Sequence, residues 1–528
     1  MGAVFHSRPL AINYGQRSGY SGNDVRILFG AADGLLRMIA NTSAGGAESG
    51  AEAWAFMPRE VMAQQKTLRD EDNAADFPYG VDGPVVAFVK DRGPGGSASD
   101  GVIDSANPDD QVLAFFGLRR GGSAYYGLDI TDPDSPELLW RIDDSLTDFA
   151  SLGRTFSEPV VARLSVDEGG TVSTRTVLFF GGGYDLKKDS ENGSGGNVGT
   201  DDSVGNAIYI VDAETGDLIW KAEQGSFTPA DFYADASKTY AHDLLLDSIP
   251  SQLTVLDTDG DGLADRYYVG DTGGRLWRGD LPGSDRNSWT LTPLASIGRH
   301  NGTATVATDR RFFHRPDYAP TRSSEGNKFD TVLIGSGDRA DPENLSAEDF
   351  LYAFRDHDTA IGKTAAEVIT TEAGLPDHAD FQDITNQCLV AGGSCPDDTA
   401  LATGWRLELT QTGEKALSTP LTTGGVVLFS SFVPPGATVC EPAEGSARQY
   451  AVSLFNGAPA NIERYTSDGD GNPRTRNAAA TGFPADTLPI SASTVINGAE
   501  VDTLPTRTRW ETYWRERLGE EEEPVVQP

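Results

Sequence analysis

A repeated unit of two short strands joined by a tight turn constrains the fold of this chain more than any other feature. The unit is clearest at 124–140 (AYYGLDITDPDSPELLW) and at 207–220 (AIYIVDAETGDLIW), and both copies end in tryptophan. A degenerate copy covers 35–56, and partial copies cover 350–356 and 449–457. A lone hairpin cannot bury its apolar faces, so several units must pack against one another. This pattern predicts radially arranged blades.

We therefore predict an all-β chain with a β-propeller fold. A seven-bladed ring would need about 75 residues per blade, against ~40–50 for compact blades. The surplus is predicted in long loop insertions near 90–111, 187–204 and 358–403, which are rich in Gly, Ser, Asp and Asn. The propeller domain is expected to cover 1–508, followed at 509–528 by a short C-terminal helix and an acidic tail.

The charge balance excludes several classes of partner. The chain has 42 Lys and Arg against 79 Asp and Glu, a net charge of −37. Nucleic-acid binding and docking on anionic lipid both need a basic surface, so neither is expected. The chain contains no apolar run of about 18 residues, and hence no predicted membrane span. The first ~30 residues lack a secretory signal, so we expect a fragment from which any export signal has been removed.

The cysteines leave two interpretations open. Cys388 and Cys395 flank a turn-prone segment where a small-loop disulfide is plausible, and Cys440 is left over. Three unpaired thiols are an equally good interpretation of the sequence.

The strongest motif is an acidic loop within 256–281 (LDTDGDGLADRYYVGDTGGRLWRGDL). Asp257, Asp259 and Asp261 occupy alternate positions, and Asp265 follows at the ninth position. Calcium takes six to eight oxygen ligands, and this spacing lets a single loop surround the ion. The Leu263 carbonyl is expected to point inward, and Asp265 is expected to close the site in place of an EF-hand glutamate. The flanking segments read as strands, so the ion would pin a strand connection.

A solvated acidic turn is the alternative interpretation of this loop, but the interleaved glycines favour calcium.

Three other motifs are weaker. Asp468, Asp470 and Asn472 repeat part of the spacing without a closing carboxylate. The Arg278-Gly279-Asp280 tripeptide continues a predicted strand, whereas an adhesive tripeptide needs an exposed loop tip. The GxGxxA pattern at 335–340 has no surrounding strand–helix–strand unit, so we expect no nucleotide site.

The sequence offers no catalytic constellation. The histidines are scattered without an HExxH motif, and no GxSxG elbow is present. We expect a protein that is not an enzyme.

The calcium loop and its flanks resemble the C-terminal domain of the PilY family (PilC in some bacteria) of type IV pilus biogenesis and pilus-tip proteins. Further matches follow in the family's order along nearly the whole chain. They are VRILFGAAD (25–33), WAFMPREV (54–61), YYGLDITDP (125–133), SEPVVARL (157–164), GGGY (181–184), IYIVDAETG (208–216), VLIGSG (332–337), LYAFRD (351–356), VVLFSSF (426–432) and WRERL (514–518).

The resemblance implies a modified seven-bladed β-propeller. It implies an exported protein at the cell surface, outer membrane and pilus tip (fimbrium) that supports pilus assembly against retraction, twitching motility and adhesion. Its implied partners are minor pilins and a host or surface receptor. Calcium would be bound by Asp257, Asp259, Asp261, the Leu263 carbonyl and Asp265.

The chain departs from the family in two respects. The family usually has a large aromatic residue at the position of Gly279. The insertion containing Cys388 and Cys395 has no counterpart that we can match. The family's variable N-terminal region often carries adhesive function, so we expect that this fragment does not adhere alone.

Two alternatives to the pilus module stay open. The tryptophan-bearing repeats resemble those of quinone-cofactor dehydrogenases, but an adjacent cysteine pair is missing and eight tryptophans are too few for regular docking. A scaffold like the integrin-type propellers would use calcium only to rigidify its blades.

Overall fold

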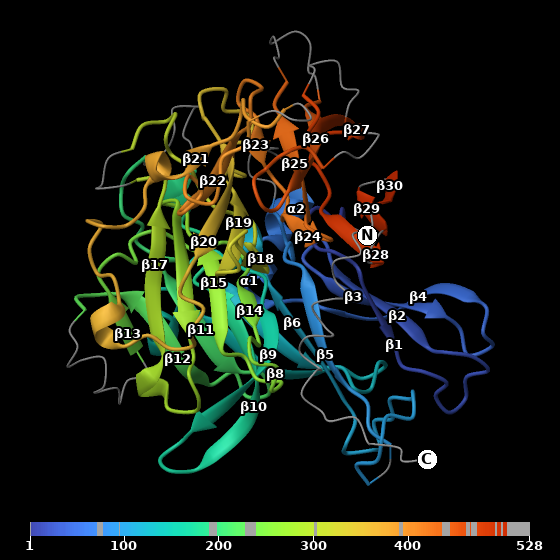
Figure 1. Cartoon of the computed structure of the whole chain (residues 1–528). Coiled ribbons are helices and arrows are strands. Elements are labelled where there is room, and N and C mark those ends of the chain that lie inside the picture. Colours follow the sequence, from blue (N-terminus) through green and yellow to red (C-terminus); the bar gives the residue numbers. More distant parts are fainter. Residues whose placement is uncertain are drawn as a thin grey trace, which may run out of the picture.

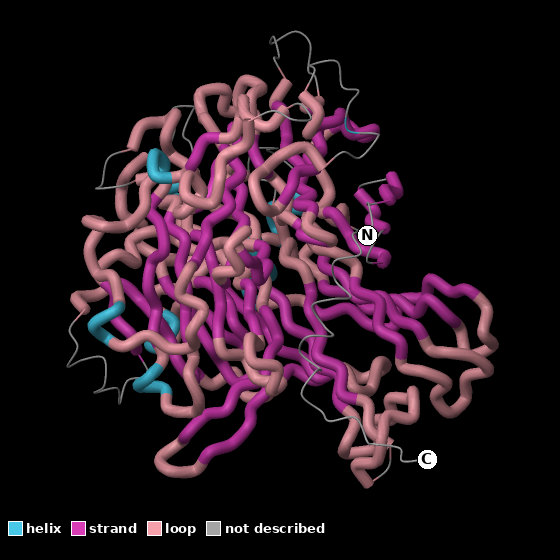
Figure 2. Tube along the Cα trace, viewed as in Figure 1, coloured by secondary structure: helices cyan, strands magenta, loops and turns pink. Residues whose placement is uncertain are grey.

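The computed structural model describes residues 2–70, 78–93, 95–189, 198–227, 239–299, 304–389, 394–435, 444–460, 465, 472–491, 494–497 and 500–503. Strands dominate this part of the chain, and its helical segments are short (Figure 2). Helices α1 (Arg59–Met62) and α2 (Gln65–Asp70) follow the first sheet. None of the described helices is long and apolar enough to cross a membrane. The predicted C-terminal helix and tail at 509–528 lie outside the described residues.

The described strands form seven sheets, each built from strands consecutive in the chain (Figure 1). The first sheet contains β1 (Leu10–Asn13), β2 (Val25–Gly30), β3 (Leu36–Thr42) and β4 (Glu48–Phe56). The second contains β5 (Val85–Lys90), β6 (Gln111–Gly117), β7 (Ala124–Asp129) and β8 (Glu137–Asp143). The third contains β9 (Val160–Asp167), β10 (Val172–Gly181), β11 (Ala207–Asp212), β12 (Leu218–Gln224) and β13 (Thr239–His242).

The other four sheets continue in the same order. The fourth contains β14 (Thr254–Leu256), β15 (Arg266–Gly270), β16 (Arg275–Asp280) and β17 (Thr290–Ser296). The fifth contains β18 (Asp317–Arg322), β19 (Lys328–Gly335), β20 (Phe350–Asp356), β21 (Gln382–Asp383) and β22 (Gly404–Glu408). The sixth contains β23 (Lys415–Ala416), β24 (Leu421–Thr423), β25 (Val426–Val433), β26 (Ser446–Ser453) and β27 (Thr475–Thr481). The last contains β28 (Thr487–Ser491), β29 (Thr494–Asn497) and β30 (Glu500–Thr503).

Pairing is antiparallel except where β13 joins β12 and β21 joins β22. The long connections of the first two predicted insertions lie between β5 and β6 and between β10 and β11, and that of the third lies between β20 and β22. In each case the extra length is placed between paired strands, so the sheet itself is not interrupted.

Each sheet packs its face on the sheet that follows it in the chain. Successive apolar clusters join the first sheet to the second, the second to the third, and so on to the last. This packing buries the apolar strand faces that a single hairpin would leave in water. The all-β prediction is confirmed, and the stacked sheets are the arrangement expected of propeller blades.

The recurring tryptophans connect neighbouring sheets. Trp54 Nε1 donates to the Pro133 carbonyl at 3.0 Å, and Trp140 Nε1 donates to the Ala213 carbonyl at 2.9 Å. Trp405 Nε1 donates to the Leu454 carbonyl at 3.2 Å. In each case a tryptophan of one sheet reaches a strand connection of the next sheet. The repeated tryptophan is therefore a contact between sheets.

Candidate metal centre

The acidic loop connects the first two strands of the fourth sheet, as the sequence predicts. β14 and β15 pair antiparallel, with Leu256 opposite Arg266, so residues 257–265 form the turn between them. Gly260 and Gly262 have φ angles of 83° and 87°. This left-handed conformation is strained for residues with a Cβ, so the two glycines allow the short loop to fold back on itself.

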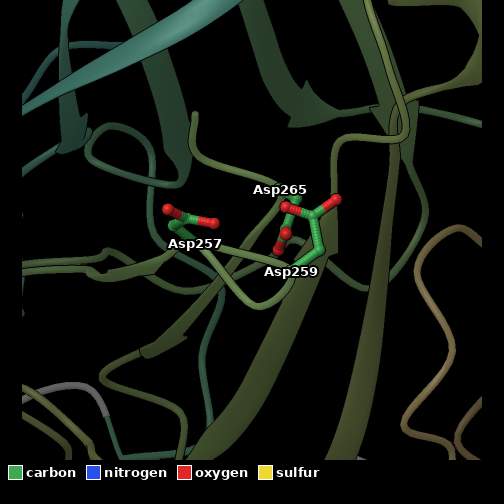
Figure 3. Close-up of side chains that lie close together, drawn as sticks. All are labelled: Asp257, Asp259 and Asp265. Atoms are coloured by element: carbon green, nitrogen blue, oxygen red, sulfur yellow. The ribbon is translucent and has the colours of Figure 1, made fainter. Parts of the chain in front are cut away.

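Three carboxylates of the loop converge. Asp257, Asp259 and Asp265 each offer an oxygen, and these oxygens lie within 4.8 Å of one another (Figure 3). Calcium binds oxygen at 2.3–2.6 Å, so opposite ligands of one ion lie about 5 Å apart. The three carboxylates therefore fit a calcium ion, with Asp257 and Asp259 facing solvent and Asp265 only 8% exposed.

Backbone amides fix the orientation of the Asp257 carboxylate. It accepts hydrogen bonds from Gly260 N at 2.6 Å, Asp261 N at 3.2 Å and Gly262 N at 2.8 Å. The loop therefore presents a pre-oriented Asp257 carboxylate, and carboxylate oxygens are the ligands that calcium takes.

The Asp265 carboxylate is held by Thr258. The Thr258 amide donates to Oδ2 at 2.8 Å, and its hydroxyl lies 2.8 Å from both carboxylate oxygens. Burial raises the pKa of Asp265, and the nearby Asp259 charge raises it further, while the hydrogen bonds from Thr258 lower it. A bound cation would relieve this repulsion between Asp259 and Asp265. The role of Thr258 was not predicted, because the motif spacing records only the carboxylates.

Asp261 and Leu263 lie in the same loop but outside the group of three carboxylates. Asp261 Oδ1 accepts a hydrogen bond from Leu263 N at 2.7 Å, which closes the turn locally. Of the predicted ligand set, the structure thus brings Asp257, Asp259 and Asp265 together. Coordination by Asp261 and by the Leu263 carbonyl stays a prediction.

A buried ion-pair network begins directly after the loop. Arg266, which directly follows Asp265, donates to Asp280 at 3.0 Å and to Asp330 at 2.9 Å. Arg278 donates to Asp280 at 2.8 Å and to Asp356 at 2.8 Å. Arg278 and Asp280 are both fully buried, so the Arg278-Gly279-Asp280 tripeptide is not an exposed adhesive loop.

The structure gives a reason for the glycine at position 279. A Cβ at this position would lie 2.0 Å from the Tyr267 ring. Tyr267 thus occupies the space that a side chain at position 279 would need.

The remaining sequence candidates do not form further sites in the described residues. Gly335 ends β19, and a Cβ there would lie 2.4 Å from Ala416, so the GxGxxA segment is closely packed by the next sheet. Asp468 and Asp470 lie outside the described residues, as does Cys440. Cys388 and Cys395 form a disulfide with Cα atoms 4.9 Å apart, which agrees with the small-loop alternative.

Comparison with known proteins shows which proteins this chain is similar to. No family model matches the chain. It is 25% identical over 448 residues to a type IV pilus biogenesis factor PilY1 homolog of Xylella fastidiosa, covering 82% of this chain and 26% of that protein. It is 28% identical over 307 residues to the type IV pilus biogenesis factor PilY1 of Pseudomonas aeruginosa UCBPP-PA14, covering 54% of this chain and 21% of that protein.

A solved structure shows the same fold. The crystal structure of the Pseudomonas aeruginosa PilY1 C-terminal domain matches with a TM-score of 0.58 at 21% identity. The match covers 91% of this chain and 92% of that domain. The chain spans about a quarter or less of the length of these curated relatives.

Proposed function

Because this chain is a homologue of the PilY1 type IV pilus biogenesis factors and has the fold of their C-terminal domain, we propose that it is a calcium-binding pilus biogenesis module. It would act at the cell surface and pilus tip, supporting pilus assembly against retraction and attachment to surfaces. Its partners would be minor pilins and a host or surface receptor. The convergence of Asp257, Asp259 and Asp265 is the observation that carries the calcium part of the proposal.

The proposed ring has seven blades, one for each sheet. Ring closure is supported by Arg8, which precedes β1, and Asp486, which precedes β28, because their side chains lie 3.9 Å apart. The first and last sheets of the chain thus meet, as the ends of a propeller must.

The position of the loop suggests how an ion could influence the surrounding structure. Ala264 N, at the end of the loop, donates to the Arg163 carbonyl of β9 at 2.8 Å. The loop therefore contacts the third sheet as well as the fourth. Asp257, Asp259 and Asp265, with Asp261 and the Leu263 carbonyl, would hold the ion, which supplies charge neutralisation. By ordering the loop, calcium would then stabilise the junction between these two sheets.

A cellular experiment tests this function. Asp259→Ala is made in the full-length protein of the source bacterium, and Asp285→Ala, in an exposed turn of the same sheet, serves as the matched control. We expect Asp259→Ala to change surface pilus number and twitching motility at unchanged protein level, and Asp285→Ala to behave as wild type. Unchanged piliation in Asp259→Ala would contradict a regulatory role for the loop.

The contact between Ala264 and Arg163 also favours a second candidate, a scaffold in which calcium only rigidifies the sheets. The two functions differ in partner binding. If calcium raises the melting temperature but leaves affinity for minor pilins unchanged, the scaffold is correct.

A further inference from the structure

A polar cavity lies between the second and third sheets. Its volume is about 480 Å³, which lies within the range of about 300–1,000 Å³ that is typical of small-molecule sites. Its walls come from the connection between β6 and β7, the end of β8, the segment after β10, and the segments before β9 and β11. Glu60 of α1 and the nearby Gln64 complete the lining. None of the lining residues belongs to the acidic loop, so this cavity is independent of the proposed calcium site.

Negative charge exceeds positive charge on the cavity wall. Four carboxylates and two guanidinium groups line it: Glu60, Asp143, Asp144, Asp185, Arg141 and Arg154. The formal charge of the wall is therefore 2 − 4, or −2. Such a wall attracts a ligand that carries positive charge.

The Arg141 guanidinium is neutralised within the wall itself. Its Nε donates to Glu60 Oε1 at 2.8 Å, and its Nη1 pairs with Asp143. Glu60 also accepts a hydrogen bond from the Tyr126 hydroxyl at 2.6 Å. These contacts hold α1 against β8, so the three charged groups that make them are not free to bind a ligand.

The other three charged groups of the wall have no partner of opposite charge among the described residues. Asp185 accepts hydrogen bonds from Lys187 N at 2.9 Å and from Ser203 N at 2.8 Å, but it forms no ion pair there. Asp144 is exposed and Arg154 is half-buried, and within the described part of the chain neither side chain forms a hydrogen bond or an ion pair. Both signs of charge are therefore available to a ligand in one cavity.

Gln64 adds an acceptor that is not used. Its Nε2 donates to the Gly121 carbonyl at 2.8 Å, whereas its buried Oε1 has no hydrogen-bond partner among the described residues. A buried acceptor without a donor is costly, so a donor on a ligand in the cavity would stabilise this wall.

Apolar side chains supply the remaining lining. Leu152 is buried, Val204 is half-buried and Leu186 is exposed. All three come from the segments that flank the strands of the third sheet. A ligand with a short apolar group would cover this part of the wall and remove it from water.

We propose that this cavity binds a small α-amino acid with an apolar side chain, in its zwitterionic form. The ammonium group would lie at Asp144 and Asp185, and the carboxylate would pair with Arg154, because guanidinium groups form strong paired hydrogen bonds with carboxylates. The apolar side chain would cover Leu186 and Val204. Since the wall has a net charge of −2, the ammonium group should contribute more to binding than the carboxylate.

Calorimetric titration of the folded chain tests the proposal with three matched probes at neutral pH. Leucine carries both charges, 3-methylbutylamine lacks the carboxylate, and 4-methylpentanoate lacks the ammonium group. We expect leucine to bind at one saturable site, the amine to bind at least about tenfold more weakly, and 4-methylpentanoate to bind more weakly still. The proposal is overturned if leucine shows no saturable binding, or if either analogue binds as tightly as leucine.

Two variants assign the charges within the cavity. Arg154→Gln should weaken leucine at least about tenfold without weakening 3-methylbutylamine, because the amine has no carboxylate to lose. Asp144→Asn should weaken both of these probes. Arg154→Lys should retain part of the leucine affinity, because it keeps the charge but loses the planar fork. Wild-type leucine affinity in Arg154→Gln or in Asp144→Asn would overturn the assignment.

Arg69→Gln and Asp285→Asn are the matched controls, because they remove the same charges from exposed positions outside the cavity. Both should bind leucine as the wild type does. Asp144 and Arg154 make no side-chain contact that holds the fold, so their variants should unfold at the urea midpoint of the wild type. This measurement separates lost binding from lost folding.

Discussion

Replacing Asp247 with asparagine tests how a single buried carboxylate holds an insertion against the sheet that carries the acidic loop. Asp247 is fully buried between β13 and β14. It accepts hydrogen bonds from Lys188 at 3.0 Å, Arg275 at 2.8 Å and Arg299 at 3.0 Å. Burial alone would raise the pKa of Asp247, but the three cations outweigh it and hold the pKa below its usual value.

The expected cost follows from leaving these cations without their shared anion. Removing one member of a buried ion pair typically costs about 3–5 kcal/mol. The loss does not triple, because Arg275 keeps Glu372 and Arg299 keeps Asp201. We therefore expect Asp247→Asn to lower the free energy of unfolding by about 3–5 kcal/mol, a large share of the 5–15 kcal/mol typical of a folded domain.

Urea unfolding followed by tryptophan fluorescence measures this change, and Trp277 is a suitable reporter because it donates to Asp271 beside the cluster. Asp148→Asn, at an exposed carboxylate, is the matched control and should stay within about 0.5 kcal/mol of wild type. A loss below about 1 kcal/mol for Asp247→Asn at unchanged urea slope would refute the reasoning.

Two further predictions concern packing and pH. Gly279→Ala should lower the free energy of unfolding by about 1–3 kcal/mol, because its Cβ would meet the Tyr267 ring. Adding Tyr267→Leu should recover part of this loss. Equal urea midpoints for wild type and Gly279→Ala would argue against this packing. Burial lowers the pKa of His242 to about 4, below the ~6.5 of an unfolded histidine, so its neutral form contributes stability that is complete above pH ~6.5 and is lost as the pH falls toward 4. Between pH ~6.5 and 4, the free energy of unfolding of His242→Asn should therefore fall by about 3 kcal/mol less than that of the wild type, as measured by urea unfolding at each pH. Equal losses in the two proteins would contradict this role for His242.

Local sequence features predicted much of the fold and the site. The hairpin units and their turns are specified by neighbouring residues, so the β-class of the fold followed from the repeats. The alternate aspartates and two glycines lie within nine positions, so the loop between β14 and β15 was also accessible. The conformation of Gly260 and Gly262 agrees with this local reasoning.

Features that depend on distant contacts were not accessible. Arg8 meets Glu158 and Asp486 only because the sheets gather around one axis. The repeats place tryptophans at recurring positions, but they do not specify the partners, which are the carbonyls of Pro133, Ala213 and Leu454 in the next sheet. These contacts join residues far apart in the chain, so the local sequence pattern does not reveal them.

Calcium titration by calorimetry tests the binding claim most directly. The chain is stripped of divalent ions and titrated at near-physiological ionic strength, alongside Asp265→Ala and the exposed variant Asp259→Ala. The wild type is predicted to bind one calcium ion at the loop and to gain about 2.7 kcal/mol of stability when free calcium is a hundredfold above Kd, while both variants lose this site. Undiminished calcium affinity in both variants, or no binding by the wild type at millimolar calcium, would contradict calcium binding by this loop.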